Sequence, residues 1–279
     1  MPELNSDSIL KYLETEFERE LCKAAFDNLS QETNKLKFSN FSYTLRELIR
    51  HTLVRLSPDK HILNCSWYTN QIPDSENRIT RAQRIKYSIQ GGIDDNTINN
   101  VLNLDIDNLN TQWKDVLEVL NKYTHINEDA LNISSELISS HVNECIFCFH
   151  ELFRSIKEAR ETIIIKLEQR IEETIIDQVI SNYIEEIGEM ATHYWTNGLD
   201  IDNYEITDID HKNIMIEVTG NIYATLQYGS DSDVRNDIGG TIDKDFQFKA
   251  IIQQKILNLN NPELEVVKLE IEKQKNEDE

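Results

Sequence analysis

The sequence predicts an α+β protein, with a mainly helical N-terminal region followed by a small β-rich C-terminal domain. Before residue 198, apolar residues recur at spacings of three and four, which is typical of amphipathic helices. From Gly198 onward the segments are β-branched or alternating, and Gly, Asn and Asp separate them. A chain of 279 residues exceeds the usual size of one domain. We therefore expect two domains, residues 1–197 and 198–279.

Two helices are expected in the first 56 residues. Apolar side chains at spacings of one, three and four predict a single amphipathic helix over residues 6–34. Asn40 is a candidate N-cap for a second helix, whose buried side would carry Leu45, Leu48, Ile49, Thr52 and Val54. The Ser57-Pro58 pair should end that helix, because a proline disfavours helical backbone in the residue before it.

The middle of the chain continues the helical pattern after an irregular segment over residues 59–77. A short basic helix over residues 78–90 should stop at Gly91-Gly92. Another is expected over residues 108–125, with Trp113 on its apolar face. Helical spacing then extends over residues 134–190, a length that predicts one or two breaks.

Strands are expected in the last third of the chain. The segments NIMIEVTG, NIYATLQYG, FQFKAIIQ and LEVVKLEI have strand character. Thr219-Gly220-Asn221 is a candidate hairpin turn between the first two.

Composition and charge exclude several classes of protein. The N-terminus lacks the features of a signal peptide, and no segment approaches the roughly 20 apolar residues of a membrane-spanning helix. We expect a cytoplasmic protein with reduced thiols at Cys22, Cys65, Cys145 and Cys148. A net charge of -22 disfavours nonspecific binding to nucleic acid or to an anionic membrane.

Positive charge is concentrated in residues 35–86, which we call the cationic segment. It carries ten basic and four acidic residues, a net charge of +6, so the rest of the chain carries -28. The basic residues are Lys35, Lys37, Arg46, Arg50, Arg55, Lys60, Arg78, Arg81, Arg84 and Lys86. This distribution indicates either an anion-binding site or paired surface charge.

Arg46 and His51 form an Arg-x4-His pattern on the second expected helix. A histidine can act as a general base, and a nearby arginine can stabilise charge on a phosphate. Five residues subtend about 140° on a helix, so the two side chains could border one groove without lying on one face. Arg50 lies closer to Arg46 than His51 does, measured as the angle around the helix axis. His125 is a second candidate base, or alternatively a cap at a helix C-terminus.

Three other sets of residues invite a metal or nuclease interpretation. His141, Cys145, Cys148 and His150 have helical spacing, which core packing explains better than zinc binding. Turn chemistry likewise accounts for Asp231, Asp233 and Asp237. Glu217, Glu263 and Lys268 lie on or beside candidate strands but lack the spacing of a restriction-nuclease motif. We therefore expect neither a catalytic metal nor a cofactor.

Several blocks in order resemble the family of predicted PIWI-associated nucleases, which occur in prokaryotic conflict systems. The blocks are LRELIRHTLVRLSPD, NCSWY, ITRAQRIKYSIQGG, LNKYTH and ATLQYGSDSDVRNDIGG, and they span nearly the whole chain. The Arg-x4-His placement also resembles the HEPN superfamily of helical ribonucleases, in which an Arg and a His form a metal-independent site across a homodimer. Glu47 follows Arg46 where the commonest HEPN form has a polar Asn or His.

These resemblances imply an antiviral or mobile-element effector that cleaves RNA without metal. His51, or His125 as its rival, would take the proton from a 2'-hydroxyl, and Arg46 would stabilise the phosphorane with help from Arg50. Neighbouring phosphates would bind Arg78, Arg81 and Arg84. The implied partners are RNA, a second copy of the chain and PIWI-like proteins. The alternatives are a non-catalytic module that dimerises or senses a partner, and a metal-dependent DNA nuclease.

Overall fold

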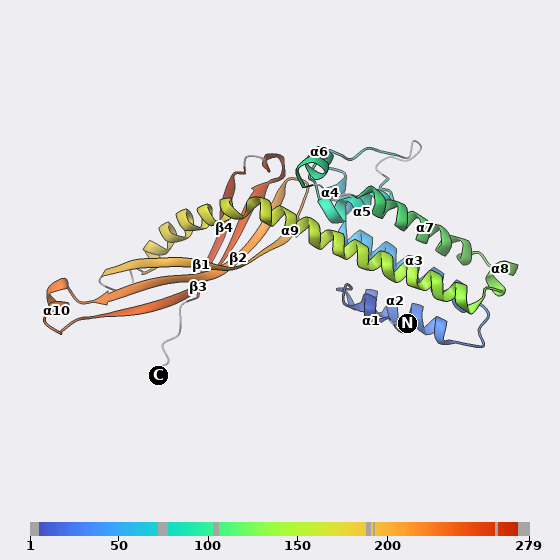
Figure 1. Cartoon of the computed structure of the whole chain (residues 1–279), viewed down its shortest axis with the longest axis horizontal. Helices are drawn as coiled ribbons and strands as arrows, with labels where there is room; N and C mark the ends of the chain where they lie inside the picture. The colour runs from blue at the N-terminus through green and yellow to red at the C-terminus, as the bar shows by residue number, and fades with distance from the viewer. Residues whose placement is uncertain are drawn as a thin grey trace. The chain divides into compact units, whose positions relative to one another are not determined.

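The computed structural model describes residues 6–71, 78–102, 106–187, 191, 193–259 and 262–272 (Figure 1). Helices occupy the first part of the chain and a four-stranded antiparallel sheet occupies the last, which confirms the predicted α+β class. The chain forms two compact units, Met1–Ala159 and Arg160–Glu279, which we call the helical unit and the sheet unit. The division into domains at residues 197 and 198 stays a prediction. No helix within the described ranges is long and apolar enough to span a membrane.

Two helices, α1 (Asp7–Leu10) and α2 (Glu16–Ser30), form where one was predicted. Thr15 has extended backbone and caps α2. Its side chain accepts a hydrogen bond from the Glu18 backbone N–H, and the Glu18 carboxylate accepts one from the Thr15 N–H. This capping box starts a new helix. The prediction of one helix over residues 6–34 is therefore wrong.

Helix α3 spans Lys37–Leu56 and carries the Arg-x4-His pattern. It begins before the predicted cap, because the Asn40 backbone N–H already donates to the Leu36 carbonyl at 2.9 Å. The prediction of an N-cap at Asn40 is therefore wrong. The predicted end before Ser57-Pro58 is confirmed. Leu45, Leu48, Ile49 and Thr52 are buried, as their spacing predicted, whereas Val54 is 40% exposed, so its predicted burial is wrong.

Short helices and one long helix complete the middle of the helical unit. They are α4 (Asp59–Ile62), α5 (Arg81–Gln90), α6 (Asp95–Thr97), a π-helical turn (Ile98–Leu102), α7 (Asp107–Thr124) and α8 (Glu128–Leu131). Thr80 caps α5 with a second capping box. Gly91 ends α5 with a φ of 57°, a conformation that glycine adopts without strain, so the predicted stop is confirmed. Residues 72–77 of the irregular segment lie outside the described ranges.

Aromatic side chains form the core between α3, α7 and the first part of α9 (Ser135–Ile187). Phe38, Trp113 and Phe149 are almost completely buried. The Phe38 ring meets Tyr123 edge-on at 4.9 Å between centroids, and Trp113 meets Phe149 edge-on at 5.4 Å. Such edge-to-face pairs add to the stabilisation that burial provides. This core fixes the positions of α3 and α7 relative to each other.

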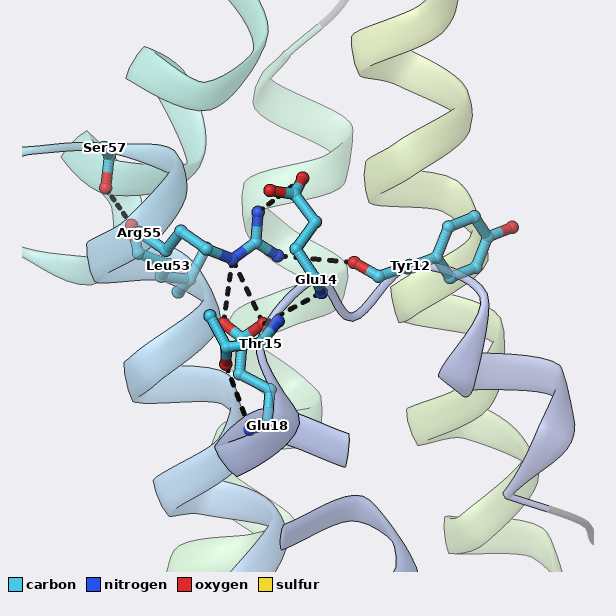
Figure 2. A network of polar contacts seen from close by, with 7 residues as sticks. All are labelled: Tyr12, Glu14, Thr15, Glu18, Leu53, Arg55 and Ser57. Atoms are coloured by element: carbon cyan, nitrogen blue, oxygen red, sulfur yellow. Dashed lines mark hydrogen bonds and ion pairs between the residues drawn. The ribbon is translucent and has the colours of Figure 1, made fainter. Parts of the chain in front are cut away.

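A buried ion pair joins the start of α2 to the end of α3 (Figure 2). Arg55 Nε donates to both carboxylate oxygens of Glu18, at 2.9 and 3.1 Å. Its other nitrogens contact the Glu14 carboxylate at 2.8 Å and the Tyr12 carbonyl at 3.3 Å. Burial acts to raise the pKa of Glu18. The hydrogen bond and charge of Arg55, with the N–H groups of Thr15 and Glu14, outweigh burial and hold that pKa below its usual value.

Helix α9 is continuous from Ser135 to Ile187, so the prediction of one or two breaks is wrong. Its first part belongs to the helical unit and buries side chains such as Val142 and Leu152. Its second part belongs to the sheet unit and buries Ile163, Leu167 and Ile171 at four-residue spacing. Each unit therefore packs against its own part of the helix. A helix of this length needs such packing, because tertiary contacts provide most of a helix's stability.

The sheet has the strand order β1-β2-β3-β4, with every pair antiparallel. The strands are β1 (His193–Ile209), β2 (Asn213–Tyr228), β3 (Gly240–Lys255) and β4 (Leu264–Ile271). One face carries buried apolar side chains such as Ile216, Ile222 and Phe248. The second part of α9, which belongs to the same unit, runs along the sheet (Figure 1). Two bonds tie them together, Tyr204 Oη to Glu172 at 3.3 Å and the Val266 N–H to Gln178 at 3.2 Å.

Gly220 lies inside β2, so the predicted hairpin turn at Thr219-Gly220-Asn221 is wrong. The two segments predicted as separate strands form one strand, and Gly220 pairs with both Ile201 and Phe248. A Cβ at position 220 would lie 2.1 Å from the Asp200 carbonyl oxygen. Glycine is needed there because β1 approaches closely.

Candidate functional site

Arg46 projects from α3 to the C-terminal end of α7. Its Nη1 donates to Thr124 Oγ1 at 3.3 Å, and the Thr124 hydroxyl in turn donates to the Asn121 carbonyl at 2.7 Å. The Arg46 Nε is buried and has no hydrogen-bond partner among the described residues. Nor does Arg46 form an ion pair with any acidic residue in that part of the chain. It is a half-buried guanidinium with unused donors.

Arg81 opens α5 and lies within the electrostatic field of Arg46. Arg81 is exposed as a residue, but nearby atoms partly shield its guanidinium from water, which lowers its pKa. The positive charge of Arg46 lowers that pKa further, and the negative charge of Glu47 opposes the change. Two cations this close repel each other. An anion that bound to both would relieve the repulsion.

His125 follows Thr124 directly and forms the C-cap of α7. The residue is exposed, and its backbone is extended, with φ -94° and ψ 114°. The hydrogen bond from Arg46 to Thr124 therefore brings Arg46 next to the residue that precedes His125. The position also agrees with the alternative interpretation of His125 as a helix cap.

His51 makes contacts on a different side of α3. Its ring forms an edge-to-face pair with the ring of Phe17 of α2, with 4.9 Å between centroids. Arg50 Nη2 lies 2.7 Å from His51 Nε2. Because a guanidinium can only donate, Nε2 accepts this bond and the imidazole proton lies on Nδ1. To act as a base through Nε2, His51 would first have to lose its bond to Arg50.

The other arginines assigned to phosphate differ in how much of their charge is engaged. Arg84 donates to the Ser57 carbonyl at 2.8 Å and to the Asp59 carboxylate at 2.6 Å, and its side chain is 15% exposed. Arg50 pairs with Glu47 at 2.9 Å. Arg78 is exposed. Arg84 thus fixes α5 to the end of α3, whereas Arg78 and Arg81 face solvent.

Acidic residues from outside the cationic segment neutralise part of its charge. Arg55 pairs with Glu14 and Glu18, and Lys86 pairs with Asp95 at 2.7 Å. The net charge of +6 counted along the sequence is therefore smaller in space. The interpretation of paired charge therefore applies to these basic residues. Arg46 and Arg81 form no ion pair with a carboxylate in the described part of the chain.

A groove between α5 and α7 lies beside Arg81 and has a volume of about 460 Å³. We call it the α5–α7 groove. Its lining is apolar in part, with cations and amide side chains beside the apolar residues. The lining residues are Arg81, Ala82, Ile85, Asn110, Thr111, Trp113, Lys114, Leu117, Glu118 and Asn121.

Sequence reasoning missed this groove. Its signal is a stripe on α7 at spacings of four, three and four, in which Asn110, Lys114 and Asn121 are polar or basic and Leu117 is apolar. That stripe becomes visible as a site only when α5 is known to lie beside it.

The cysteine and histidine set on α9 has structural contacts. Burial raises the pKa of Cys145 above its usual range and that of Cys148 to about 12, which keeps both thiols protonated. His141 contacts Glu144 at 3.2 Å, and His150 contacts Tyr12 Oη at 2.7 Å. The two thiols are therefore protonated, and each histidine contacts a different residue. These four side chains had been considered as zinc ligands because of their spacing.

The acidic loop between β2 and β3 folds around a short helix, α10 (Asp231–Arg235). Asp233 accepts hydrogen bonds from the Ser230 backbone and hydroxyl, at 2.8 and 2.7 Å. Asp231 accepts one from Gln227 at 3.0 Å. Asp237 has a positive φ of 58°. Asp231 and Asp233 serve the turn, in agreement with the turn interpretation.

On the sheet, Glu217 and Lys268 pair with other residues. Glu217 pairs with Lys249 at 2.7 Å, and Lys268 pairs with Glu270 on its own strand at 2.5 Å. Glu263 lies just before β4. Glu217 and Lys268, which had suggested a restriction-nuclease site, therefore pair with other residues and not with each other.

Comparison with known proteins gives two matches, one to each part of the chain. A family model described as "Predicted pPIWI-associating nuclease" matches residues 10–149, and a second model with the same description matches residues 156–275. The two models meet close to the boundary between the helical and sheet units. No curated protein matches the chain, and neither does any solved structure.

Proposed function

The chain belongs to the family of predicted pPIWI-associating nucleases, and we propose that it cleaves RNA without a metal as an effector of a prokaryotic conflict system. The family description supports a nuclease function linked to PIWI-type proteins. The observation that carries the finer proposal is the pair Arg46 and Arg81. These two cations interact electrostatically, and neither forms an ion pair with a carboxylate within the described ranges, where Glu47 pairs with Arg50.

A phosphodiester group is the anion that suits this pair. Guanidinium groups present several N–H donors in a plane, and phosphate oxygens accept them strongly. Arg46 would stabilise the charge on the phosphorane with its positive charge, and Arg81 would bind the neighbouring phosphate. Arg78 is an exposed cation three residues before Arg81 and would bind a further phosphate.

We assign the general base to His125 in preference to His51. His125 is exposed and follows the residue that Arg46 contacts. His51 Nε2 already accepts a hydrogen bond from Arg50. The base would take the proton from the 2'-hydroxyl of the substrate, and that oxygen would attack the phosphorus to give a 2',3'-cyclic phosphate.

The matched variants His125→Gln and His51→Gln test this assignment. We expect His125→Gln to lower the rate of RNA cleavage by at least about 100-fold, the lower end of what a positioned general base contributes. His51→Gln should retain most of the activity. The reverse pattern would move the base to His51, and full activity in both folded variants would contradict a histidine base.

Two controls address the mechanism. Cleavage should persist in EDTA, and an RNA with a 2'-deoxy nucleotide at the cleaved position should not be cut there. If EDTA abolished cleavage and Mg²⁺ or Mn²⁺ restored it, the protein would be a metal-dependent nuclease. Sedimentation of the purified chain should give a homodimer, as the HEPN resemblance implies. A monomer that cleaves RNA would contradict that part of the proposal.

A second candidate function is a partner-sensing module, which exposed apolar residues at the end of the β2–β3 hairpin favour. Ile238 is 79% exposed and Ile242 is 50% exposed. The net charge of -22 also suits a protein partner better than a polyanion. Replacing both isoleucines by serine should weaken binding of a PIWI-like protein from the same system. Val267→Ser, on the exposed part of β4, is the matched control.

A further inference from the structure

Three buried polar atoms without hydrogen-bond partners belong to residues that line the α5–α7 groove. They are Asn110 Oδ1, Asn121 Oδ1 and Trp113 Nε1, and no described residue bonds to any of them. Trp113 is 1% exposed. Buried polar groups in folded proteins are nearly always paired, so three unpaired atoms around one groove call for an explanation. A ligand that supplies the missing partners would provide one.

The chemistry of the three atoms defines that ligand. The two amide oxygens accept hydrogen bonds, and the indole N–H donates one. Ile85, Trp113 and Leu117 line the groove with apolar side chains, each at most 6% exposed. Arg81 and Lys114 add positive charge, although Lys114 also lies 3.9 Å from Glu118. A planar group with two donors, one acceptor and an attached phosphate fits this set.

We propose that the α5–α7 groove is a base-binding subsite for single-stranded RNA with a preference for guanine. The Watson–Crick edge of guanine offers N–H donors at N1 and N2 and an acceptor at O6, which matches the unpartnered atoms of Asn110, Asn121 and Trp113. Uracil presents two acceptors and one donor, the opposite pattern. Single-stranded RNA exposes these edges, whereas a duplex hides them.

The inference rests on the proposed function, because Arg81 belongs to both the groove and the pair with Arg46. A nucleotide whose base occupied the groove would place its phosphate near Arg81. The groove volume of about 460 Å³ lies within the range of small-molecule sites, so it can admit a nucleotide. The groove would thereby select the base beside the phosphate that Arg46 and Arg81 bind.

The test is binding of short RNA to the full chain. The probes are 5'-labelled pentanucleotides, UUGUU and UUUUU, made with 2'-O-methyl groups so that they cannot be cleaved. By fluorescence anisotropy, UUGUU should bind at least about tenfold more tightly, the effect expected of a few specific base contacts. Replacing guanine by inosine, which lacks the amino group at C2, should remove part of this preference without any change in the protein.

Protein variants assign the preference to the groove. Asn110→Leu combined with Asn121→Leu should abolish the preference while affinity for UUUUU stays within about twofold. Asn132→Leu is the matched control, because Asn132 is exposed and bonds only locally to the Glu128 carbonyl. Its preference should equal that of the wild type.

The outcomes separate the two proposals. Equal affinity of the wild type for both pentanucleotides, or an undiminished preference in the double variant, would overturn the base-binding subsite while RNA binding stood. If neither pentanucleotide bound at low salt, the proposed RNA-directed function would fail and the subsite with it.

Discussion

Two arginines on the same helix have opposite surroundings. Arg55, at the end of α3, meets the carboxylates of Glu14 and Glu18 and the carbonyl of Tyr12 (Figure 2). Arg46 lies nine residues earlier and meets a hydroxyl and the positive charge of Arg81. The first guanidinium is satisfied within the fold. The second keeps unused donors, which is the condition for binding an anion from outside.

From this difference we infer that positive charge is free to bind an external anion only where the chain does not neutralise it. Removal of one partner from a buried ion pair leaves the other charge unpaired, which costs stability. Removal of a cation that repels its neighbour should cost the fold little. Stability and RNA binding should therefore respond in opposite ways at the two arginines.

The largest expected effect is a loss of stability when the ion pair of Arg55 is broken. Glu18→Ala leaves Arg55 without its buried partner and removes the capping box of α2, so the free energy of unfolding should fall by about 3–5 kcal/mol. Urea denaturation followed by circular dichroism measures this. Glu47→Ala is the control, because the Glu47 side chain is 37% exposed and surface pairs contribute only about 0–1 kcal/mol. Equal losses of unfolding free energy in the two variants would contradict a special role for the buried ion pair.

The same ion pair should make stability depend on pH, an effect smaller than that of Glu18→Ala. The pKa of folded Glu18 lies below its ordinary value of 4.5, so its ionised form stabilises the native state above that pH. This contribution should be lost as the pH falls through the lowered pKa. In Glu18→Gln that part of the acid destabilisation should be absent. Parallel curves for variant and wild type between pH 5 and pH 2 would refute the role of this carboxylate.

The smallest expected effect concerns salt. Arg81→Ala should remove about one phosphate contact, so the slope of log affinity against log salt should become shallower by about one. Arg84→Ala should leave the slope unchanged and lower stability, because Arg84 is engaged by Ser57 and Asp59. Identical slopes in wild type and Arg81→Ala would show that Arg81 does not bind an RNA phosphate.

Sequence patterns predicted the elements that local chemistry determines. The end of α3 before Pro58, the stop of α5 at Gly91 and the strand β4 depend on residues close in sequence. The capping box at Thr15 is also local, and it was overlooked within a longer apolar pattern. The role of Gly220 could not be read from the sequence, because it depends on the carbonyl of Asp200 in another strand.

The residue types of the candidate site follow from the sequence, whereas their arrangement does not. Chemistry alone singled out Arg46 and both candidate histidines. Counting charge along the chain overstated the cationic segment, because Glu14 and Glu18 reach Arg55 from outside it. The α5–α7 groove was missed since its walls come from helices separated in sequence.

The most direct test compares Arg46→Gln with Arg55→Gln in two assays, urea unfolding and RNA cleavage per folded molecule. Arg46→Gln should unfold within about 0.5 kcal/mol of the wild type and lose at least about 100-fold in cleavage rate. Arg55→Gln should lose stability by about 3 kcal/mol and keep its cleavage rate at temperatures where it is folded. A folded Arg46→Gln protein that cleaves RNA at the wild-type rate would contradict the assignment of Arg46 to the site.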